Sequence, residues 1–436
     1  MKILTVVFDL GPGGTQRVAV NYAVGYKENG IESAVLAHRG TGVREEFLDN
    51  KGIPVFVGGA TLDKRKLGVS AALEWNPDVV HIHRTGYPDA ESGAVLRQLA
   101  DGRRKVMETN VFARFDRTSD CDLIDLHLML SHWCLWKFER WSSHRAQRPV
   151  AAVVPNAVDS KNFYPLTSIE KNKVRREWGI PGDAFVFGRI GQPGHAKWSP
   201  CIFPAFTRVA KSNSEAYLVL VGLPSGYEQY ISKLPKDVKD RVITLPFQHG
   251  DANLRLCYGG MDVFLHAARI GESFGMVLCE AMLCGVPVIT LATPCKDNSQ
   301  GEVVGHNVGG LVVRQKRYIT KAMLLLMKDD ILHRKLSEQA RQRVLSQFEM
   351  SVVVPRLVKI ATLLNNAKDR DEVRQRLEQD AEMTTTSDWK LLKKGLQGAM
   401  GRTPPFEDCV RWIVHQPHFY NIWSIAKKNL LGRCKP

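Results

Sequence analysis

The sequence predicts an α/β protein built from two successive domains, each with a parallel sheet. Short runs rich in β-branched residues alternate with helical patterns along most of the chain, which is typical of strand–helix–strand units. The alternation loosens at 156–165 and then starts again, which indicates two domains rather than one large sheet. The length of 436 residues agrees with this division, since domains usually hold about 100–200 residues.

The pattern defines the elements and the domain boundaries in chain order. Strands of the first domain are expected at 3–8, 33–37, 55–57, 79–83, 105–108, 126–130 and 152–155, with helices such as 15–29 and 90–100 between them. Strands of the second domain are expected at 185–189, 217–221, 242–245, 263–265, 286–290 and 310–313. The expected divisions are an N-terminal domain at 1–165, a second domain at 166–348, a crossover helix at 349–366 and an extension at 367–436.

Composition narrows the class of protein without choosing a function. The chain is 44% hydrophobic and 24% charged, which is typical of a globular protein. Its net charge of +15 favours acidic partners, namely a phosphorylated substrate, an anionic membrane surface or a nucleic acid. Nine cysteines without a CxxC pair indicate a reducing compartment and no zinc site. No apolar run reaches the length of a membrane span, so a cytoplasmic protein is expected.

A glycine-rich turn follows the first expected strand. Residues 11–15 read Gly-Pro-Gly-Gly-Thr and lead directly into a helix, whose N-terminal amides suit a phosphate. The dinucleotide fingerprint needs a third glycine where Gln16 stands, and an acid at the end of the second strand, where His38 and Arg39 stand. These departures argue against a nicotinamide cofactor. Tight packing of the strand on the helix would also require glycine here.

Two cations of the second domain are expected to meet at one edge of its sheet. Arg189 ends a buried strand, and Lys197 precedes Ser199 and Pro200, which together predict a helix start. Ligands of α/β sheets bind at the carboxyl ends of the strands. Two positive charges and free amides there would hold a diphosphate without a metal ion.

The segment 271–287, GESFGMVLCEAMLCGVP, carries two acidic residues on either side of a helix start. Glu272 precedes the helix, and Glu280 lies about two turns further along, roughly 10 Å away at ~1.5 Å per residue. This distance approaches the span from sugar ring to ribose in an extended nucleotide sugar. One carboxylate would then accept hydrogen bonds from sugar hydroxyls and the other from ribose hydroxyls. A buried structural acid is the alternative for Glu280, and an acid that interacts with the helix dipole is the alternative for Glu272.

These motifs, taken together and in order, resemble the signature of family 4 glycosyltransferases with the GT-B fold. The resemblance covers residues 1 to about 365 and includes 13–17 (GGTQR), 81–83 (HIH), 154–159 (VPNAVD), Gly188 and Arg189 with Lys197, Glu272 with Glu280, and 306–313 (HNVGGLVV). It implies two Rossmann-like domains facing a central cleft, the first for the acceptor and the second for the donor. It also implies retaining transfer of a hexose from a nucleotide diphosphate sugar to a glycan, lipid-linked or other hydroxyl acceptor, as in polysaccharide biosynthesis. No cofactor or metal ion is implied beyond the donor itself.

The resemblance also assigns roles to individual residues. Arg189 and Lys197 would hold the diphosphate, Glu280 the ribose, and Glu272 the donor sugar. Ser273, Phe274 and Gly275 would add backbone contacts to the sugar. His83 would face the reacting centre, and Gly13 and Gly14 would lie near the phosphate or the acceptor. The expected catalytic residues are therefore His83, Arg189, Lys197 and Glu272.

One departure and two alternative functions stay open. The spacing from Arg189 to Lys197 is longer than the common form, and Gln192 could stand where other members carry a basic residue. A sugar-nucleotide epimerase of similar fold is one alternative. The other is a non-catalytic protein that binds a nucleotide sugar or a nucleic acid, although no nucleic-acid-binding motif is present and no such partner is expected.

The C-terminal extension combines basic and aromatic residues. From Trp389 to Pro436 there are nine Lys and Arg residues against Glu407 and Asp408, a difference of +7. Six aromatic residues are interleaved with them: Trp389, Phe406, Trp412, Phe419, Tyr420 and Trp423. Such a segment suits peripheral binding at the anionic inner face of a membrane. The alternative is a helical appendage whose aromatic side chains pack on the core or on another subunit.

Overall fold

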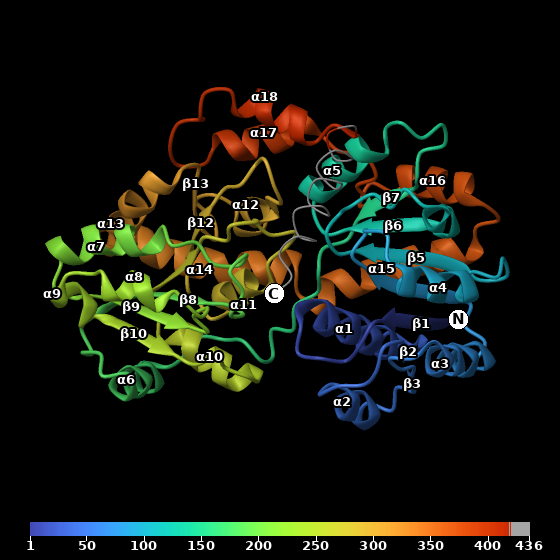
Figure 1. Ribbon diagram of the computed structural model, residues 1–436, viewed down its shortest axis with the longest axis horizontal. Helices are drawn as coiled ribbons and strands as arrows, with labels where there is room; N and C mark the ends of the chain where they lie inside the picture. Colours follow the sequence, from blue (N-terminus) through green and yellow to red (C-terminus); the bar gives the residue numbers. More distant parts are fainter. Residues whose placement is uncertain (418, 420–436) are drawn as a thin grey trace. The chain divides into compact units, whose positions relative to one another are not determined.

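The structure is a computed structural model that describes residues 1–417 and 419 and forms two compact units (Figure 1). The first unit contains Met1–Ala157, Met350–Trp389 and the described residues from Asp408 onward. The second unit contains Val158–Glu349 and Lys390–Glu407. The chain therefore passes between the units more than once.

The first unit is built on a seven-stranded parallel sheet with strand order β3-β2-β1-β4-β5-β6-β7. Its strands are β1 Lys2–Val7, β2 Glu32–Ala37, β3 Val55–Val57, β4 Val79–Arg84, β5 Lys105–Asn110, β6 Leu126–Met129 and β7 Ala151–Val153. Its helices are α1 Gly14–Glu28, α2 Glu45–Asn50, α3 Leu62–Glu74, α4 Ala90–Leu99, the 3₁₀ helix η1 Ser119–Leu123, α5 His132–Ser142, α15 Met350–Asn366 and α16 Arg370–Gln379. The α18 helix, Glu407–Val414, lies almost wholly in this unit.

The second unit repeats the plan with six parallel strands in the order β10-β9-β8-β11-β12-β13. Its strands are β8 Phe185–Ile190, β9 Ala216–Val221, β10 Val242–Leu245, β11 Val263–His266, β12 Val288–Leu291 and β13 Gly310–Val313. Its helices are α6 Ser168–Glu177, α7 Ile202–Ser212, α8 Glu228–Ser232, α9 Lys236–Lys239, α10 Asp251–Gly259, α11 Met276–Leu283, α12 Ser299–Val304, η2 Lys316–Tyr318, α13 Ile319–Lys328 and α14 Asp330–Gln347. The α17 helix, Trp389–Gln397, lies almost wholly in this unit.

Burial on both faces explains why the strands read as continuous apolar runs. In β1, Leu4 and Val6 belong to one core cluster, whereas Val7 belongs to the cluster on the opposite face. Parallel sheets covered by helices on both sides require this pattern. The thirteen strands expected from the sequence are all present, and the predicted α/β fold class is confirmed.

Each sheet has one point where the direction of strand addition reverses. In the first unit this switch point lies between β1 and β4, and in the second unit between β8 and β11. The loops that leave neighbouring strands diverge at such a point and leave a crevice for ligands. The residues at the ends of these four strands are therefore candidates for a ligand site.

Two details of the sequence prediction need correction. The helix predicted to start at Ser199 and Pro200 begins instead at Ile202, after a turn in which the Phe203 amide donates to the Pro200 carbonyl. The second unit also starts at Val158, ahead of the expected boundary at 165/166. The Val158 amide donates to the Phe348 carbonyl at 2.8 Å, and this hydrogen bond joins the linker to the second unit.

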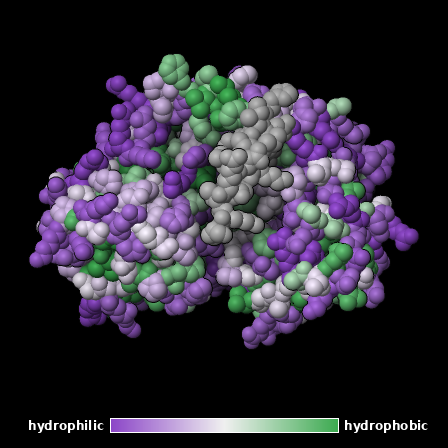
Figure 2. Space-filling view, in the orientation of Figure 1, coloured by the Kyte–Doolittle hydropathy of each residue, from purple (hydrophilic) through white to green (hydrophobic). Residues whose placement is uncertain are grey.

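The C-terminal extension is divided between the two units. Trp389 packs in the first unit with its ring 5.1 Å from that of Trp136, and Arg411 lies 4.4 Å over the Trp389 ring. Trp412, in contrast, is 59% exposed. Hydrophilic residues cover most of the face in Figure 2, and apolar residues gather over the extension.

Part of the predicted basic and aromatic pattern lies outside the described residues: Tyr420, Trp423, Lys427, Lys428, Arg433 and Lys435. Within the described chain, no helix is long and apolar enough to span a membrane.

Candidate active site

Arg189 is a buried cation at the switch point of the second sheet. It is the next-to-last residue of β8 and is 2% exposed. One Nη atom donates to the Lys197 carbonyl at 2.7 Å, while the other has no hydrogen-bond partner within the described chain. Its guanidinium lies over the rings of Trp198 and Phe264, at 5.4 and 5.7 Å. Burial lowers the pKa of Arg189 to about 10, so the side chain stays charged at neutral pH.

Glu272 joins three parts of the second unit at the same edge of the sheet. Its carboxylate receives a hydrogen bond from Lys197 Nζ at 2.5 Å and lies 3.3 Å from Nε2 of His266, the last residue of β11. Lys197 keeps 37% of its side chain exposed, whereas Glu272 keeps 9%. Lysine carries three donor hydrogens, so Lys197 can bind a further anion without leaving Glu272.

The electrostatics of this cluster fix the charge of each member. Burial works to raise the pKa of Glu272, but the charge of Lys197 and the hydrogen bond with His266 outweigh it and lower the pKa to about 2. Burial, reinforced by the charge of Arg189, lowers the pKa of His266 to about 4. At neutral pH the cluster therefore holds two cations, one carboxylate and a neutral imidazole.

The backbone around Glu272 is held by glycine and by α12. Gly271 has φ +72°, and a Cβ there would lie 1.7 Å from the Asp297 carbonyl oxygen, so no other residue fits. The Glu272 amide donates to the side chain of Gln300, and its carbonyl accepts from the Ser299 amide. Gly275, at φ +97°, then turns the chain into α11. The side chain of Glu272 is thereby fixed just before a helix N-terminus, as the sequence predicts.

Glu280 lies inside α11 and is 4% exposed. It accepts a hydrogen bond from the Tyr258 hydroxyl at 2.9 Å, and burial together with this carboxylate raises the pKa of Tyr258. A buried carboxylate needs such a partner. Phe274 is also buried and packs edge-on against Phe348, with ring centroids 5.3 Å apart. Of the predicted donor-site residues, Arg189, Lys197 and Glu272 therefore form one connected group, and Ser273, Phe274 and Gly275 follow Glu272 directly.

His83 lies near the end of β4, at the switch point of the first sheet, and neither of its ring nitrogens has a hydrogen-bond partner within the described chain. Its ring lies 4.7 Å from that of His81 and 5.7 Å from that of Tyr22. Burial lowers the pKa of His83 to about 3, which keeps the ring neutral. His81, two residues earlier, bonds to the Tyr26 hydroxyl at 2.8 Å and to Thr109 Oγ1 at 2.7 Å. Of these two histidines, only His83 has polar atoms left for a ligand.

The glycine-rich turn lies at the same switch point, after β1. Gly13 precedes α1, which starts at Gly14, and a Cβ on Gly13 would lie 2.3 Å from the side-chain oxygen of Gln16. Gln16 donates to Asp9 Oδ1 at 2.7 Å, and the Gly11 amide donates to the same atom. Close packing against Gln16 is thus sufficient to explain why residue 13 is a glycine. The N-terminus of α1 still presents backbone amides at this turn.

Two residues of this site, His266 and Tyr258, were not predicted from the sequence. His266 carried a usable signal, because it ends a buried strand at the switch point where Arg189 lies one residue before the end of β8. No sequence pattern points to Tyr258, because its hydrogen bond with Glu280 forms only when α10 and α11 pack together. Among the described residues, no group of three or more His, Cys, Asp or Glu side chains could hold a metal ion.

Comparison with known proteins first defines the class of fold. The Anabaena protein HepE, solved in complex with UDP and glucose, matches with a TM-score of 0.63 and 19% identity, covering 83% of this chain and 99% of that chain. A glycosyltransferase from Rickettsia africae matches with a TM-score of 0.66 and 16% identity, covering 84% of this chain and 99% of that chain. The fold is that of the GT-B glycosyltransferases.

Sequence comparison then shows which families this chain resembles. Residues 170–343 match the family model described as glycosyl transferases group 1. The N-acetyl-alpha-D-glucosaminyl L-malate synthase of Bacillus anthracis is 26% identical over 64% of this chain and 73% of that protein. The phosphatidyl-myo-inositol mannosyltransferase of Mycolicibacterium smegmatis is 24% identical over 83% of this chain and 92% of that protein. Residues 170–343 thus match the group 1 glycosyltransferases and the relatives are named glycosyltransferases, in agreement with the resemblance seen in the motifs.

Proposed function

We propose that this enzyme transfers a sugar from a nucleotide diphosphate sugar to a hydroxyl acceptor with retention of anomeric configuration and without a metal ion. The buried charge of Arg189 is the observation that carries the proposal. No carboxylate forms an ion pair with it among the described side chains, and one of its Nη atoms lacks an acceptor. The nearby charge of Glu272 opposes the effect of burial on Arg189 without a direct ion pair, and a buried cation that no carboxylate contacts is costly, so an anionic ligand is the simplest reason for its presence.

The diphosphate of the donor suits this position. Arg189 and Lys197 supply two cations at one strand edge, and their positive charge would stabilise the negative charge that grows as the bond from sugar to phosphate breaks. Glu272 would accept hydrogen bonds from sugar hydroxyls, and Glu280 from the ribose. The leaving diphosphate would help to remove the proton of the acceptor hydroxyl on the same face of the sugar, which gives retention. His83 would contribute a neutral ring from the first unit.

Relatives and structural neighbours support a nucleotide sugar without choosing one. HepE binds UDP and glucose, whereas one relative from Corynebacterium glutamicum is described as GDP-mannose-dependent. Several relatives act on phosphatidylinositol derivatives, so a lipid-linked acceptor is the form we propose for this chain. The exposed Trp412 and the basic residues of the extension would then lie near an anionic membrane surface.

A panel of nucleotide sugars tests the proposal. The purified protein should hydrolyse one donor slowly without an acceptor, and the free nucleoside diphosphate should bind competitively with that donor. The anomeric configuration of a glycoside product, read by NMR, should equal that of the donor. An epimerised nucleotide sugar as product would instead support the epimerase alternative. Binding without any turnover across the panel would support a non-catalytic protein, as would displacement of the nucleotide by RNA.

Membrane docking is tested separately by flotation with anionic liposomes. The full-length chain should float with the vesicles, and a chain ending at Lys368 that stays folded should float less. Equal flotation of both forms would contradict a membrane role for the extension.

A further inference from the structure

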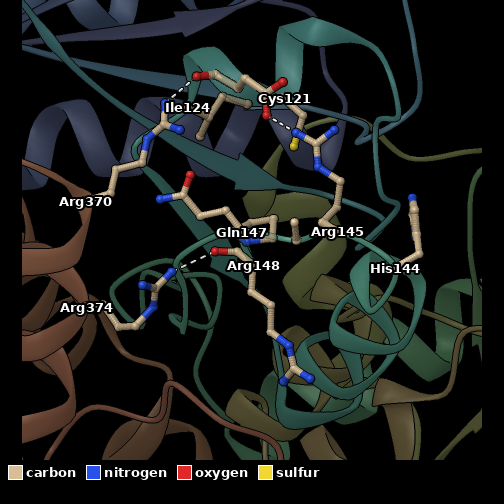
Figure 3. Close-up of a pocket in the computed structure, with 11 residues that line it drawn as sticks. Cys121, Ile124, His144, Arg145, Gln147, Arg148, Arg370 and Arg374 are labelled. Carbon is tan, nitrogen blue, oxygen red and sulfur yellow. Dashed lines mark hydrogen bonds and ion pairs between the residues drawn. The ribbon is translucent and has the colours of Figure 1, made fainter.

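A cavity of about 310 Å³ lies in the first unit, at the amino ends of β6 and β7 (Figure 3). Strands of a parallel sheet run in one direction, so this edge is opposite to the edge where β4 ends near His83. The cavity therefore lies apart from the residues of the candidate active site in this unit. Its lining includes one cysteine, Cys121 of η1, and four arginines: Arg145, Arg148, Arg370 and Arg374.

Cys121 is part of a chain of three reactive side chains. Its Sγ lies 3.8 Å from Nε2 of His127, and Nδ1 of the same ring lies 2.7 Å from Oε2 of Glu108. These are a nucleophile, a base and a carboxylate that orients the base, the arrangement that activates thiols in enzymes. Glu108 and His127 occupy paired positions on β5 and β6, so the sheet itself sets their distance.

The surroundings of His127 favour its protonated form. Burial works to lower the pKa of His127, but bonding with Cys121 and then with Glu108 outweighs it and raises the pKa to about 9. The other oxygen of Glu108 faces Arg84 at 3.4 Å, and Arg84 also pairs with Asp116 at 2.7 Å. Without a charge on His127, the carboxylates of Glu108 and Asp116 would share the single positive charge of Arg84. A protonated His127 supplies the second positive charge.

The arginines give the cavity a cationic wall. Figure 3 shows Arg370 and Arg374 reaching in from α16, while Arg145 and Arg148 come from the segment before β7. Arg145 pairs with Asp122, Arg370 lies 3.3 Å from Asp125, and Arg374 pairs with Asp371 at 2.8 Å. The excess positive charge of this wall therefore comes from Arg148. Arg374 donates to the carbonyl of Arg148 at 2.7 Å, which fixes this part of the wall, and the Arg148 side chain is exposed. Nearby cations attract anions.

We propose that Cys121 is a modification site that reacts with small anionic disulfides held in this arginine-lined cavity. In the reaction, the Cys121 thiolate attacks one sulfur of the disulfide, a new S–S bond forms, and the old S–S bond breaks. The electron pair leaves with the second sulfur as a thiolate, and the proton from Cys121 stays on His127. The product is a mixed disulfide whose negative charge faces the arginines. Neither the donor site nor the transfer reaction takes part in this step.

The test compares two aromatic disulfides, one anionic and one neutral. Dithiobis(nitrobenzoate) carries carboxylates, whereas dithiodipyridine is neutral, and peptide mass spectrometry after a short reaction at low salt reports each cysteine separately. Cys409 is exposed and serves as the internal reference. The ratio of anionic to neutral reaction rates should be about tenfold higher at Cys121 than at Cys409, the lower end of electrostatic steering.

Substitutions test separately what the cavity arginines and His127 contribute to the reaction of Cys121. Arg148→Gln should lower the ratio at Cys121 severalfold and leave Cys409 unchanged, whereas Arg208→Gln, on the exposed side of α7 in the other unit, should change neither. His127→Gln should slow the reaction of Cys121 with both reagents, and Cys121→Ser should abolish labelling of that peptide. Protection of Cys121 from both reagents while Cys409 reacts would overturn the proposal. Equal ratios at Cys121 and Cys409, or a ratio insensitive to Arg148→Gln, would overturn it as well.

Discussion

The two switch points of this enzyme are built on the same strand plan but carry different chemistry. In the second unit, Lys197, Glu272 and His266 bond to one another beside the charged Arg189. In the first unit, His83 is neutral and its ring nitrogens have no partner within the described chain. The contrast teaches that charge is concentrated where a diphosphate would bind, while the first unit offers an uncharged polar group.

The largest effect is expected from the two cations. Lys197→Ala and Arg189→Met should each reduce kcat/KM by the equivalent of about 2–4 kcal/mol, because each removes a contact to charge that develops during transfer. Arg208→Ala, a change at an exposed arginine on α7, is the matched control and should leave kcat/KM unchanged. Wild-type turnover in both variants would show that the diphosphate binds elsewhere.

Arg189→Met also separates function from stability. The arginine is buried without a carboxylate ion pair among the described side chains, so an apolar side chain of similar length should keep or raise the free energy of unfolding. A denaturant melt of the variant measures this. A strong loss of stability would mean that Arg189 is a structural residue, and the fall in turnover would then say nothing about the donor.

The next largest effect compares His81 with His83. His81→Phe should lower the free energy of unfolding by about 2–3 kcal/mol, because it leaves the hydroxyls of Tyr26 and Thr109 buried without their partner. His83→Phe removes no hydrogen bond and should change stability by less than about 1 kcal/mol while lowering kcat about a hundredfold, as loss of a positioned polar group does. A stable, fully active His83→Phe enzyme would contradict a role for His83 at the reacting centre.

A smaller effect should distinguish the two glutamates of the second unit. Glu280→Gln should raise the donor KM about tenfold with little change in kcat, since the ribose is remote from the bond that breaks. Glu272→Gln should mainly lower kcat, since it would contact the sugar itself. Steady-state kinetics with one donor measures both. If both variants alter only the donor KM, the proposed division between ribose and sugar is wrong.

How far the sequence could predict this site depends on how local each contact is. The positions of Arg189, Glu272 and Glu280 could be predicted because a strand end and a helix start lie beside them in the sequence, while their roles stay predictions. The ion pair between Lys197 and Glu272 was not found, because its partners are 75 residues apart and meet only when β8 and β11 pair. The start of α7 was misplaced, since Ser199 has good capping chemistry but the chain first makes a turn at Pro200.

The first unit shows the same limit more strongly. The strand ending in His81 and His83 was predicted with both histidines, yet nothing in the sequence says which of them is bonded. That depends on Tyr26 from α1 and Thr109 from β5, which reach His81 and not His83. The network of Cys121, His127 and Glu108 was missed entirely, because its members look like ordinary residues of separate strands and loops.

The smallest effect is the one expected from metal removal. If Arg189, Lys197 and backbone amides carry the charge of the diphosphate, EDTA should leave kcat and the donor KM within about twofold of their values, since protein cations do the work of a divalent ion. Added Mg²⁺ should likewise fail to restore the activity of Lys197→Ala. This variant extends the test to an enzyme that lacks one of the two protein cations. Full loss of activity with EDTA and recovery with Mg²⁺ or Mn²⁺ would contradict the metal-independent mechanism. Rescue of Lys197→Ala by Mg²⁺ would mean that an ion can occupy the position of the lysine charge, and the second switch point would then be a metal-assisted site.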